Sequence, residues 1–585
     1  MPASSSAHFS SAVSRAPFSA LTRVRAAYER IARVDRPEIW ITLRPQAEVE
    51  AEARALDARA DAGAAADARA VGMSGDPLPL AGRLLAVKGN IDVAGLPTTA
   101  GCPSYAYLPE RDAPAVARLR EAGALVLGTT NMDQFATGLV GTRSPYGAVR
   151  AAHAPERVSG GSSSGSAVAV ALGIVDLALG TDTAGSGRVP AAFNGIVGLK
   201  PSRGLVPTEG VVPACASLDC VTVFARTLPE ARSALALMSV PPGREAPHRT
   251  PGPWRVAVPP PDSLGPLDDG WAEAYEAAAA RLAAAGARLM PLDPTPFTEA
   301  GALLYEGAFV AERYTAVGAF VDAHTDDAHT GDTHTGAADL DPTVAGIIRR
   351  ARDIPAHRLY ADQARLDSLR TAALGALGDA DALLLPTAPG HPTLAEVAAD
   401  PLGANARLGR FTNSTNLFDL AAVAVPGGEV RGHPFGVMLI GAAGTDERLA
   451  GLAALLTPPV RLAVVGAHLT GQPLNPQLLA LGARLVRTTT TAPVYRLYAL
   501  PTEPPKPGLV HTGPAGAAIE AEIWELSAEA LGSLTAALPR PMTLGRVELA
   551  DATTVPGFLC EPAALTGAQD ITEYGGWRPY ADAHH

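Results

Sequence analysis

The sequence predicts an α/β protein in which a sheet is flanked by helices. Between residues 80 and 130, the segments LLAVKG, AVARLREAG and ALVLGTTN have the patterns of strand, helix and strand. Further along, VDLALGTD has the pattern of another buried strand and follows a small-residue helix at residues 166–173. At 585 residues the chain is too long for one ordinary core, so we expect two or more domains.

The segments outside this core predict the domain limits. Residues 20–70 are rich in alanine with interspersed charges, which favours helices with exposed faces, whereas the serine-rich residues 1–20 are expected to be disordered. A proline pair in ALLTPPVR interrupts a helical run near residues 455–461. We therefore expect a large domain over residues 21–457 and a second, small domain over residues 461–585.

A histidine-rich tract, DAHTDDAHTGDTHTGAA, occupies residues 322–338. His324, His329 and His334 recur every five residues, and this period does not keep three imidazoles on one face of a helix. Histidine and aspartate together can bind metals, but the tract is also rich in threonine and glycine. We expect a disordered surface insertion over residues 322–340 and no metal site.

Composition and charge exclude several classes of protein. The formal net charge is −12 and no long basic run occurs, which disfavours nucleic-acid binding. The four cysteines form neither a CxxC pair nor a disulfide framework, as expected in a reducing cytoplasm. The N-terminal segment lacks the apolar region of a secretory signal, and the longest apolar stretch, residues 167–180, is too short to span a bilayer. We expect a cytoplasmic protein that does not bind a membrane.

Two glycine-flanked serine clusters lie within residues 160–188, GGSSSGSAVAVALGIVDLALGTDTAGSGR. Ser162 and Ser186 each sit where glycines allow tight turns, but a serine hydroxyl needs a base to act as a nucleophile, and no histidine is near in sequence. Lys88 follows the apolar run LLAV, so burial is expected to lower its pKa and let the neutral amine accept a proton. Taken singly, the lysine could be an exposed strand end and each serine a turn residue.

Together, three separated motifs resemble the amidase signature family over residues 20–455. They are LLAVKGNIDVAGLPTTAG, GGSSSGS and TDTAGSGRVPAAFNGIVGLKPSRG, in the order and at the spacing typical of the family. The resemblance implies a mixed central sheet flanked by helices, with Ser186 as nucleophile and Lys88 as base. It also implies that Ser162 is the bridging serine and that its preceding peptide bond is cis.

The backbone before the nucleophile is expected to bind the oxyanion. Three consecutive amides precede Ser186 and would form the hole: Thr183, Ala184 and Gly185. Asp182 is expected to be a structural hydrogen-bond acceptor, and Ser163 and Ser164 to support the loop through hydrogen bonds within it.

Other segments resemble the allophanate hydrolase branch of the family, among them NMDQFATGLVGTRSPYG at residues 131–147. In LLYEGAFVAERY, Tyr305 and Arg313 are eight residues apart, which on one helix places them about 80° apart around the axis, facing one pocket. The resemblance implies that this pair holds the substrate, and a guanidinium suits the carboxylate of allophanate. Without the resemblance, Arg313 could equally be a surface residue of an amphipathic helix.

The segment from Arg461 onward resembles the additional α+β domain of allophanate hydrolases, which has a γ-glutamyl-cyclotransferase-like fold. The matching stretches include VVGAHLTGQPLN and DITEYGGWRPY. In the family the first domain releases ammonia from allophanate, and the second is implicated in loss of carbon dioxide from the product. His468 is the candidate polar residue there, or else a turn histidine satisfied by backbone; Glu522 and Glu525 are weaker candidates.

The resemblance implies a hydrolase that converts allophanate (urea-1-carboxylate) to ammonia and carbon dioxide without a cofactor, as a homodimer. It also implies a separate urea carboxylase in the same pathway, since no such portion is present here. The alternatives are a small-amide amidase or the glutaminase component of an amidotransferase. Two other classes are a catalytically inactive binding scaffold and a metalloenzyme that uses the histidine tract.

Overall fold

The computed structural model describes residues 19–67, 78–240, 252–326, 339–457, 460–502, 506–526 and 528–584. Contacts divide the chain into two compact units, Met1–Leu456 and Thr457–His585. Most of the segments expected to be disordered, residues 1–18 and 327–338, lie outside the described residues.

In the described part of the first unit, one mixed sheet of eleven strands forms the centre, and the predicted α/β class is confirmed. Its order is β1 (Trp40–Leu43), β3 (Leu125–Thr130), β2 (Leu84–Lys88), β4 (Leu177–Asp182), β6 (Cys220–Ala225), β5 (Val197–Lys200), β10 (Leu420–Val430), β11 (His433–Ala442), β9 (Ala382–Pro386), β7 (Arg255–Val258) and β8 (Arg288–Pro291). Strand β2 is parallel to β3 and β4, whereas β4, β6, β5, β10 and β11 pair antiparallel in turn.

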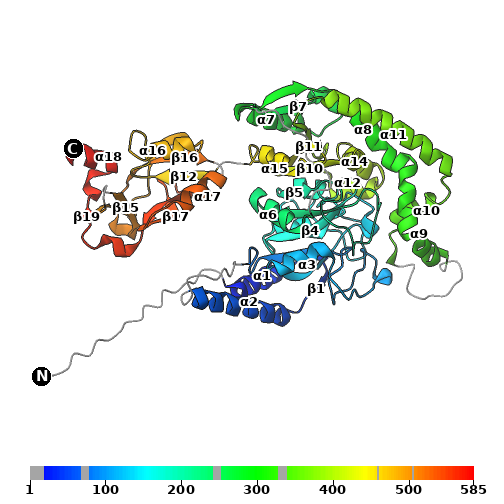
Figure 1. Ribbon diagram of the computed structural model, residues 1–585, viewed down its shortest axis with the longest axis horizontal. Helices are drawn as coiled ribbons and strands as arrows, with labels where there is room; N and C mark the ends of the chain where they lie inside the picture. Colours follow the sequence, from blue (N-terminus) through cyan, green and yellow to red (C-terminus); the bar gives the residue numbers. More distant parts are fainter. Residues whose placement is uncertain are drawn as a thin grey trace. The chain divides into compact units, whose positions relative to one another are not determined.

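Helices cover this sheet, and Figure 1 shows them along the strands of the first unit. They are α1 (Ala20–Val34), α2 (Gln46–Asp67), α3 (Pro114–Glu121), α4 (Ser164–Ala171), α5 (Val189–Phe193), α6 (Leu228–Met238), α7 (Trp271–Ala284), α8 (Thr295–Glu306), α9 (Ala311–Asp326), α10 (Pro342–Arg350), α11 (Ala356–Leu377), α12 (Leu394–Ala399), α13 (Gly403–Leu408), α14 (Asn413–Leu417) and α15 (Asp446–Ala453). Helices α3, α6 and α15 contact one another in a row, and α4 contacts α5. The main apolar core lies between the sheet and these helices.

The parallel strands bring the site residues to one edge of the sheet. In the register of β2 with β3, Lys88 is opposite Thr130, and β4 ends nearby at Asp182. All residues of these three strands are buried, as expected for parallel strands covered on both faces. The carboxyl ends of parallel strands share an edge, so Lys88 and the loop that follows Asp182 meet there.

The second unit has its own core between a five-stranded and a three-stranded sheet in its described residues. The first sheet has the order β13 (Arg484–Thr490), β16 (Glu520–Leu526), β12 (Val460–Val464), β18 (Thr554–Cys560) and β17 (Met542–Glu548); the second has β15 (Lys506–His511), β14 (Tyr495–Leu500) and β19 (Gln569–Asp570). Its helices are α16 (Asn475–Ala480), α17 (Ala528–Ala536) and α18 (Trp577–His584). Among the helices of both units that the structure describes, none is long and apolar enough to cross a membrane.

Two limits of the expected disorder are wrong. Helix α1 begins at Ala20 with its first turn capped by the Ser19 hydroxyl, so the ordered chain starts before residue 21. Helix α9 continues to Asp326, into the expected insertion 322–340. His324 stacks on Phe320 with ring centroids 3.9 Å apart, and its Nδ1 donates to the Phe320 carbonyl 2.8 Å away. Because Phe320 also packs edge-to-face on Tyr105, the last turn of this helix is anchored to the protein.

Candidate active site

Lys88 lies at the buried end of β2 and is fully enclosed. Its Nζ is 2.8 Å from Ser162 Oγ and 2.7 Å from Thr181 Oγ1. Burial lowers the pKa of Lys88 to about 7, even though the nearby carboxylates of Asp133 and Asp219 act in the opposite direction. A lysine with such a pKa is largely neutral in weakly alkaline solution and can accept a proton from a hydroxyl at this distance.

The two serines continue the chain of hydrogen bonds that starts at Lys88. Ser162 Oγ donates to Ser186 Oγ across 3.0 Å, and both side chains are buried. The peptide bond between Gly161 and Ser162 is cis, as the family resemblance implies. The structure thus brings Lys88, Ser162 and Ser186 together in the order that a proton relay requires.

The amides expected to bind the oxyanion are not equivalent. The Gly185 amide already donates to Asp182 Oδ1, 2.8 Å away. The amides of Thr183, Ala184 and Ser186 have no hydrogen-bond acceptor among the described residues. The Gly185 amide can take part only by sharing its hydrogen, so the free donors of the loop are its neighbours.

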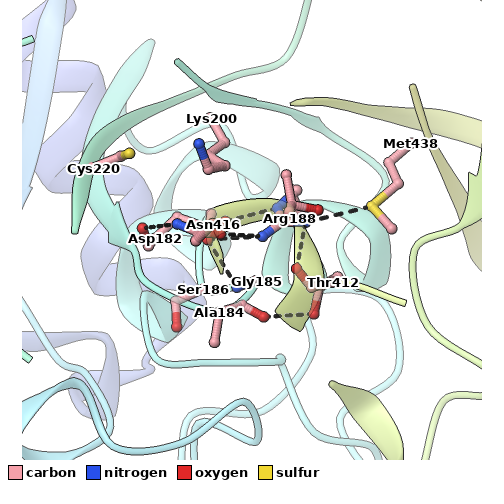
Figure 2. A network of polar contacts seen from close by, with 12 residues as sticks. Asp182, Ala184, Gly185, Ser186, Arg188, Lys200, Cys220, Thr412, Asn416 and Met438 are labelled. Carbon is pink, nitrogen blue, oxygen red and sulfur yellow. Dashed lines mark hydrogen bonds and ion pairs between the residues drawn. The ribbon is translucent and has the colours of Figure 1, made fainter. Parts of the chain in front are cut away.

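Asp182 is a hydrogen-bond acceptor, as expected, but its main partner was not foreseen. Arg188, also fully buried, donates from Nε and Nη2 to the two carboxylate oxygens of Asp182, each across 2.9 Å (Figure 2). Burial alone would raise the pKa of Asp182, but the Arg188 charge and the amides keep it lowered. Such a fork is bidentate, so the pair fixes the turn that carries Ser186. The arginine lies two residues after Ser186 in the same motif, which was the available signal.

Ser163 and Ser164 form hydrogen bonds that support the loop. Ser163 Oγ donates to the Thr181 carbonyl at 3.1 Å, and Ser164 Oγ donates to the Asn131 carbonyl at 3.2 Å. Both hydroxyls therefore contact backbone rather than the relay, but the acceptors belong to other segments, so the expectation of hydrogen bonds within the loop is wrong.

Tyr305 and Arg313 meet, but not on one helix, and that part of the prediction is wrong. Helix α8 ends at Glu306, Gly307 breaks it, a short 3-10 turn (Ala308–Val310) follows, and α9 starts at Ala311. The two helices bring Arg313 Nη2 to 3.0 Å from the Tyr305 hydroxyl oxygen, which accepts the hydrogen bond. A contact between two helices thus replaces the expected shared face.

Arg313 is a buried cation without a carboxylate partner in the described chain. Its Nη1 donates to Thr137 Oγ1 at 3.0 Å and to the Ala136 carbonyl at 3.3 Å, and its Nε has no acceptor. It lies close enough to Lys88 that its charge contributes to lowering the pKa of the lysine. A buried guanidinium with a free donor has the charge and the hydrogen-bond capacity to bind an anion.

The turn that contacts Arg313 lies in the segment NMDQFATGLVGTRSPYG at residues 131–147, in which the sequence pattern indicates no individual site residue. Phe135 and Ala136 both adopt left-handed backbone, with φ of 49° and 51°. Non-glycine residues rarely do so, and such strain is concentrated at functional sites. The turn presents the Ala136 carbonyl and the Thr137 hydroxyl to Arg313, which sequence patterning alone does not reveal.

In the second unit, His468 is buried against Phe558, with stacked rings 5.0 Å apart. Its Nε2 is 3.2 Å from Gln477 Oε1, which can only accept, so Nε2 carries the hydrogen and Nδ1 holds the lone pair. Burial lowers the pKa of His468, against the smaller opposing effect of the hydrogen bond with Gln477.

The two glutamates of β16 serve different contacts. Glu522 accepts hydrogen bonds from Thr470 and from the Trp524 indole, and it pairs with Arg578. Glu525 forms surface ion pairs with Arg461 and Arg484. The first glutamate tethers the C-terminal helix, and the second is a half-buried residue that pairs with exposed arginines of the neighbouring strands.

The histidine tract is described only in part. His324 lies in the last turn of α9, whereas His329 and His334 lie outside the described residues. Among the described residues no group of three or more histidine, cysteine, aspartate or glutamate side chains could hold a metal ion.

Comparison with known proteins places this site in a family. Residues 26–450 match the Amidase family. The chain belongs to the amidase family. Residues 460–582 match the family described as the allophanate hydrolase C-terminal domain, so both units are accounted for. The predicted resemblance is confirmed for the family and for the additional domain.

The relatives of this amidase-family protein include enzymes of several kinds. It is 40% identical to the urea amidolyase of Saccharomyces cerevisiae, over 86% of this chain, and spans 30% of the length of that protein. It is 35% identical to the 2-amino-5-chloromuconic acid deaminase of Comamonas testosteroni, over 68% of this chain and 85% of that protein. The solved structure of Kluyveromyces lactis allophanate hydrolase has 38% identity and a TM-score of 0.65, covering 97% of each chain.

Proposed function

We propose that this protein hydrolyses allophanate to ammonia and carbon dioxide through a Ser-Ser-Lys relay. The observation that carries the proposal is the buried, carboxylate-free Arg313 beside the relay of Lys88, Ser162 and Ser186. The similarity to K. lactis allophanate hydrolase over nearly the whole chain supports it. Purified protein should release ammonia from allophanate. Hydrolysis of simple amides without activity on allophanate would assign it to another branch of the family.

The proposed first reaction is acyl transfer from nitrogen to serine. Neutral Lys88 accepts the proton of Ser162 while Ser162 takes that of Ser186, whose Oγ attacks the amide carbonyl carbon. The free amides of Thr183 and Ala184 would stabilise the oxyanion that forms. Collapse of this intermediate breaks the C–N bond and returns the proton to the leaving ammonia. Water then hydrolyses the acyl-enzyme by the same relay and releases the dicarboxylated amine.

Arg313 is proposed to bind the carboxylate of allophanate, with Tyr305 holding the guanidinium. Arg313→Ala is expected to raise KM for allophanate about 10- to 100-fold, because charge-assisted hydrogen bonds contribute about 1.5–3 kcal/mol. The same variant should leave the hydrolysis of a neutral simple amide nearly unchanged, since that substrate has no carboxylate. Steady-state kinetics on both substrates test this, and an unchanged KM for allophanate would remove Arg313 from the substrate site.

The second unit is proposed to accelerate loss of carbon dioxide from the dicarboxylated product, with His468 as the candidate polar residue. His468→Ala should slow carbon dioxide release about 10²-fold while leaving the first ammonia release intact. Ammonia and carbon dioxide are measured separately on the full-length protein, with Glu525→Gln as a control in the same unit. If the ratio of carbon dioxide to ammonia released by His468→Ala equals that of wild type, the histidine is structural.

The other predictions follow from the same proposal. An enzyme that carboxylates urea must supply the substrate, and the urea amidolyases among the relatives are consistent with that link. We propose a homodimeric, cytoplasmic enzyme without a cofactor, with its domain boundary at residues 457–461. Analytical ultracentrifugation would test the dimer.

A further inference from the structure

The segment that begins at Thr412 and continues into α14 packs directly against the loop that carries Ser186. Thr412 Oγ1 donates to the Ala184 carbonyl at 2.6 Å, although it lies 228 residues later in the chain. Asn416 Nδ2 donates to the Asp182 carbonyl at 2.8 Å. Figure 2 shows both side chains at the loop, with dashed lines from Thr412 to Ala184. In the described structure, the hydrogen bonds of these two side chains do not include Ser186 itself.

These two hydrogen bonds fix the direction of the loop amides. In a trans peptide the carbonyl and the N–H point in opposite directions, and neither peptide concerned is cis. Because Asn416 holds the carbonyl of Asp182, the free N–H of Thr183 is directed away from α14. The peptide between Ala184 and Gly185 is also fixed at both ends. Thr412 donates to its carbonyl, and its N–H donates to the Asp182 carboxylate. The Ala184 amide lies between these two fixed peptides.

Arg188 links the backbone of Thr412 and the side chain of Asn416 to the loop. Its Nη1 donates to the Thr412 carbonyl at 3.1 Å, and its Nη2 donates to Asn416 Oδ1 at 2.9 Å, in addition to the bidentate pair with Asp182. Thr412 packs closely against Gly185, since a Cβ added to this glycine would lie 2.3 Å from Thr412 Oγ1. The segment is therefore a template against which the loop takes one conformation.

We propose that Thr412 and Asn416 are positioning residues that preorganise the oxyanion hole by holding the carbonyls of the nucleophile loop. The inference deepens the proposed function, on which it rests. An oxyanion hole contributes to the rate because its donors are already aligned before the charge forms. Loss of either hydrogen bond leaves Lys88, Ser162 and Ser186 in place but allows the free amides of Thr183 and Ala184 to change orientation.

The test compares variants at Thr412 that differ in one hydrogen-bond donor. Thr412→Val keeps the shape and removes the hydroxyl, and it should lower kcat about 10-fold with KM unchanged. Complete loss of one oxyanion donor costs about 10²–10³, and misalignment costs part of that. Thr412→Ser should restore kcat. The matched control is Ser414→Ala in α14, because the buried Ser414 Oγ has no hydrogen-bond partner in the described structure.

Two further readouts separate positioning from folding. Thr412→Val should bind a boronic acid, which forms a charged tetrahedral adduct with Ser186, about 10-fold less tightly, while remaining folded at the assay temperature. If Thr412→Val does not fold, Thr412→Ser and Thr412→Cys are compared, since they differ by one atom and sulfur is the weaker donor. Equal kcat in wild type and Thr412→Val, or in the Ser and Cys variants, would overturn the proposal, as would an equal loss in Ser414→Ala.

The outcome is independent of the substrate assignment. Every variant is assayed on allophanate and on a neutral simple amide, and the ratio to wild type is taken on whichever substrate is turned over. A wild-type protein that is inactive on allophanate would contradict the proposed function, whereas the Thr412 ratios on the other amide would still decide the positioning role.

Discussion

Replacement of Ser186 by alanine is expected to lower kcat by about 10⁴- to 10⁶-fold, because removing the nucleophile of a serine hydrolase leaves only the binding and oxyanion contributions. The variant keeps the fold, since Ser186 Oγ makes one hydrogen bond, to Ser162. Ammonia release from allophanate measures the loss. Ser159→Ala is a matched control in the same glycine- and serine-rich segment, because among the described residues the Ser159 hydroxyl bonds only the adjacent Gly160 carbonyl.

A covalent probe gives a second measurement of the same residue. An acylating or phosphonylating reagent should add its mass to the peptide that contains Ser186 in the wild-type protein and to no peptide in the alanine variant. Residual activity above one per cent in Ser186→Ala, or labelling that persists in it, would show that another group is the nucleophile. Labelling of Ser162 instead would reverse the assignment of the two serines.

The central part of the fold could be predicted because its signals are local. The strands at Leu84–Lys88 and Leu125–Thr130 are short buried runs around one amphipathic helix, and such runs stand out in a sequence. The edge strand Trp40–Leu43 did not stand out, because it has four residues and depends on antiparallel pairing with a strand about 90 residues later. The helix end at Asp326 depends on the stacking of His324 and Phe320, which residue composition does not show.

In the candidate site too, residues in local motifs could be predicted, whereas residues brought in by long-range contacts could not. Lys88, Ser162 and Ser186 were assigned by the family resemblance, and the structure supplies the distances between them. Thr412 and Asn416 could not be assigned, because their contacts with the loop span more than 220 residues. The pairing of Tyr305 with Arg313 was expected from one continuous helix, but tertiary packing across the break at Gly307 produces it instead.

Replacement of Lys88 by methionine is expected to lower kcat/KM by about 10²- to 10⁴-fold above pH 7, where the wild-type amine is neutral, which is the usual contribution of a general base. The wild-type profile should show the same group titrating. The neutral amine is the active form, so kcat/KM should rise about tenfold per pH unit below pH 7 and level off above it. Lys88→Arg stays protonated and should be inactive throughout. A wild-type profile without an acid limb near pH 7 would contradict the assignment of Lys88 as the base.

Burial of Lys88 also makes stability depend on pH. The pKa is about 7 in the folded chain and about 10.4 in an unfolded one, so between these values the unfolded chain binds a proton that the folded chain lacks. Stability therefore rises with pH across this window, and the penalty for burying the lysine is complete below it. Lys88→Met has no such penalty, so its melting temperature should exceed that of wild type at pH 7, and the difference should shrink toward pH 10. A lower melting temperature of the variant at pH 7 would show that a charged ammonium, bonded to Ser162 and Thr181, is the buried form. An ammonium in that position could not accept the proton of Ser162. The melting temperature of the inactive Lys88→Met variant therefore tests whether Lys88 is neutral, and so able to act as the base, in the wild-type enzyme.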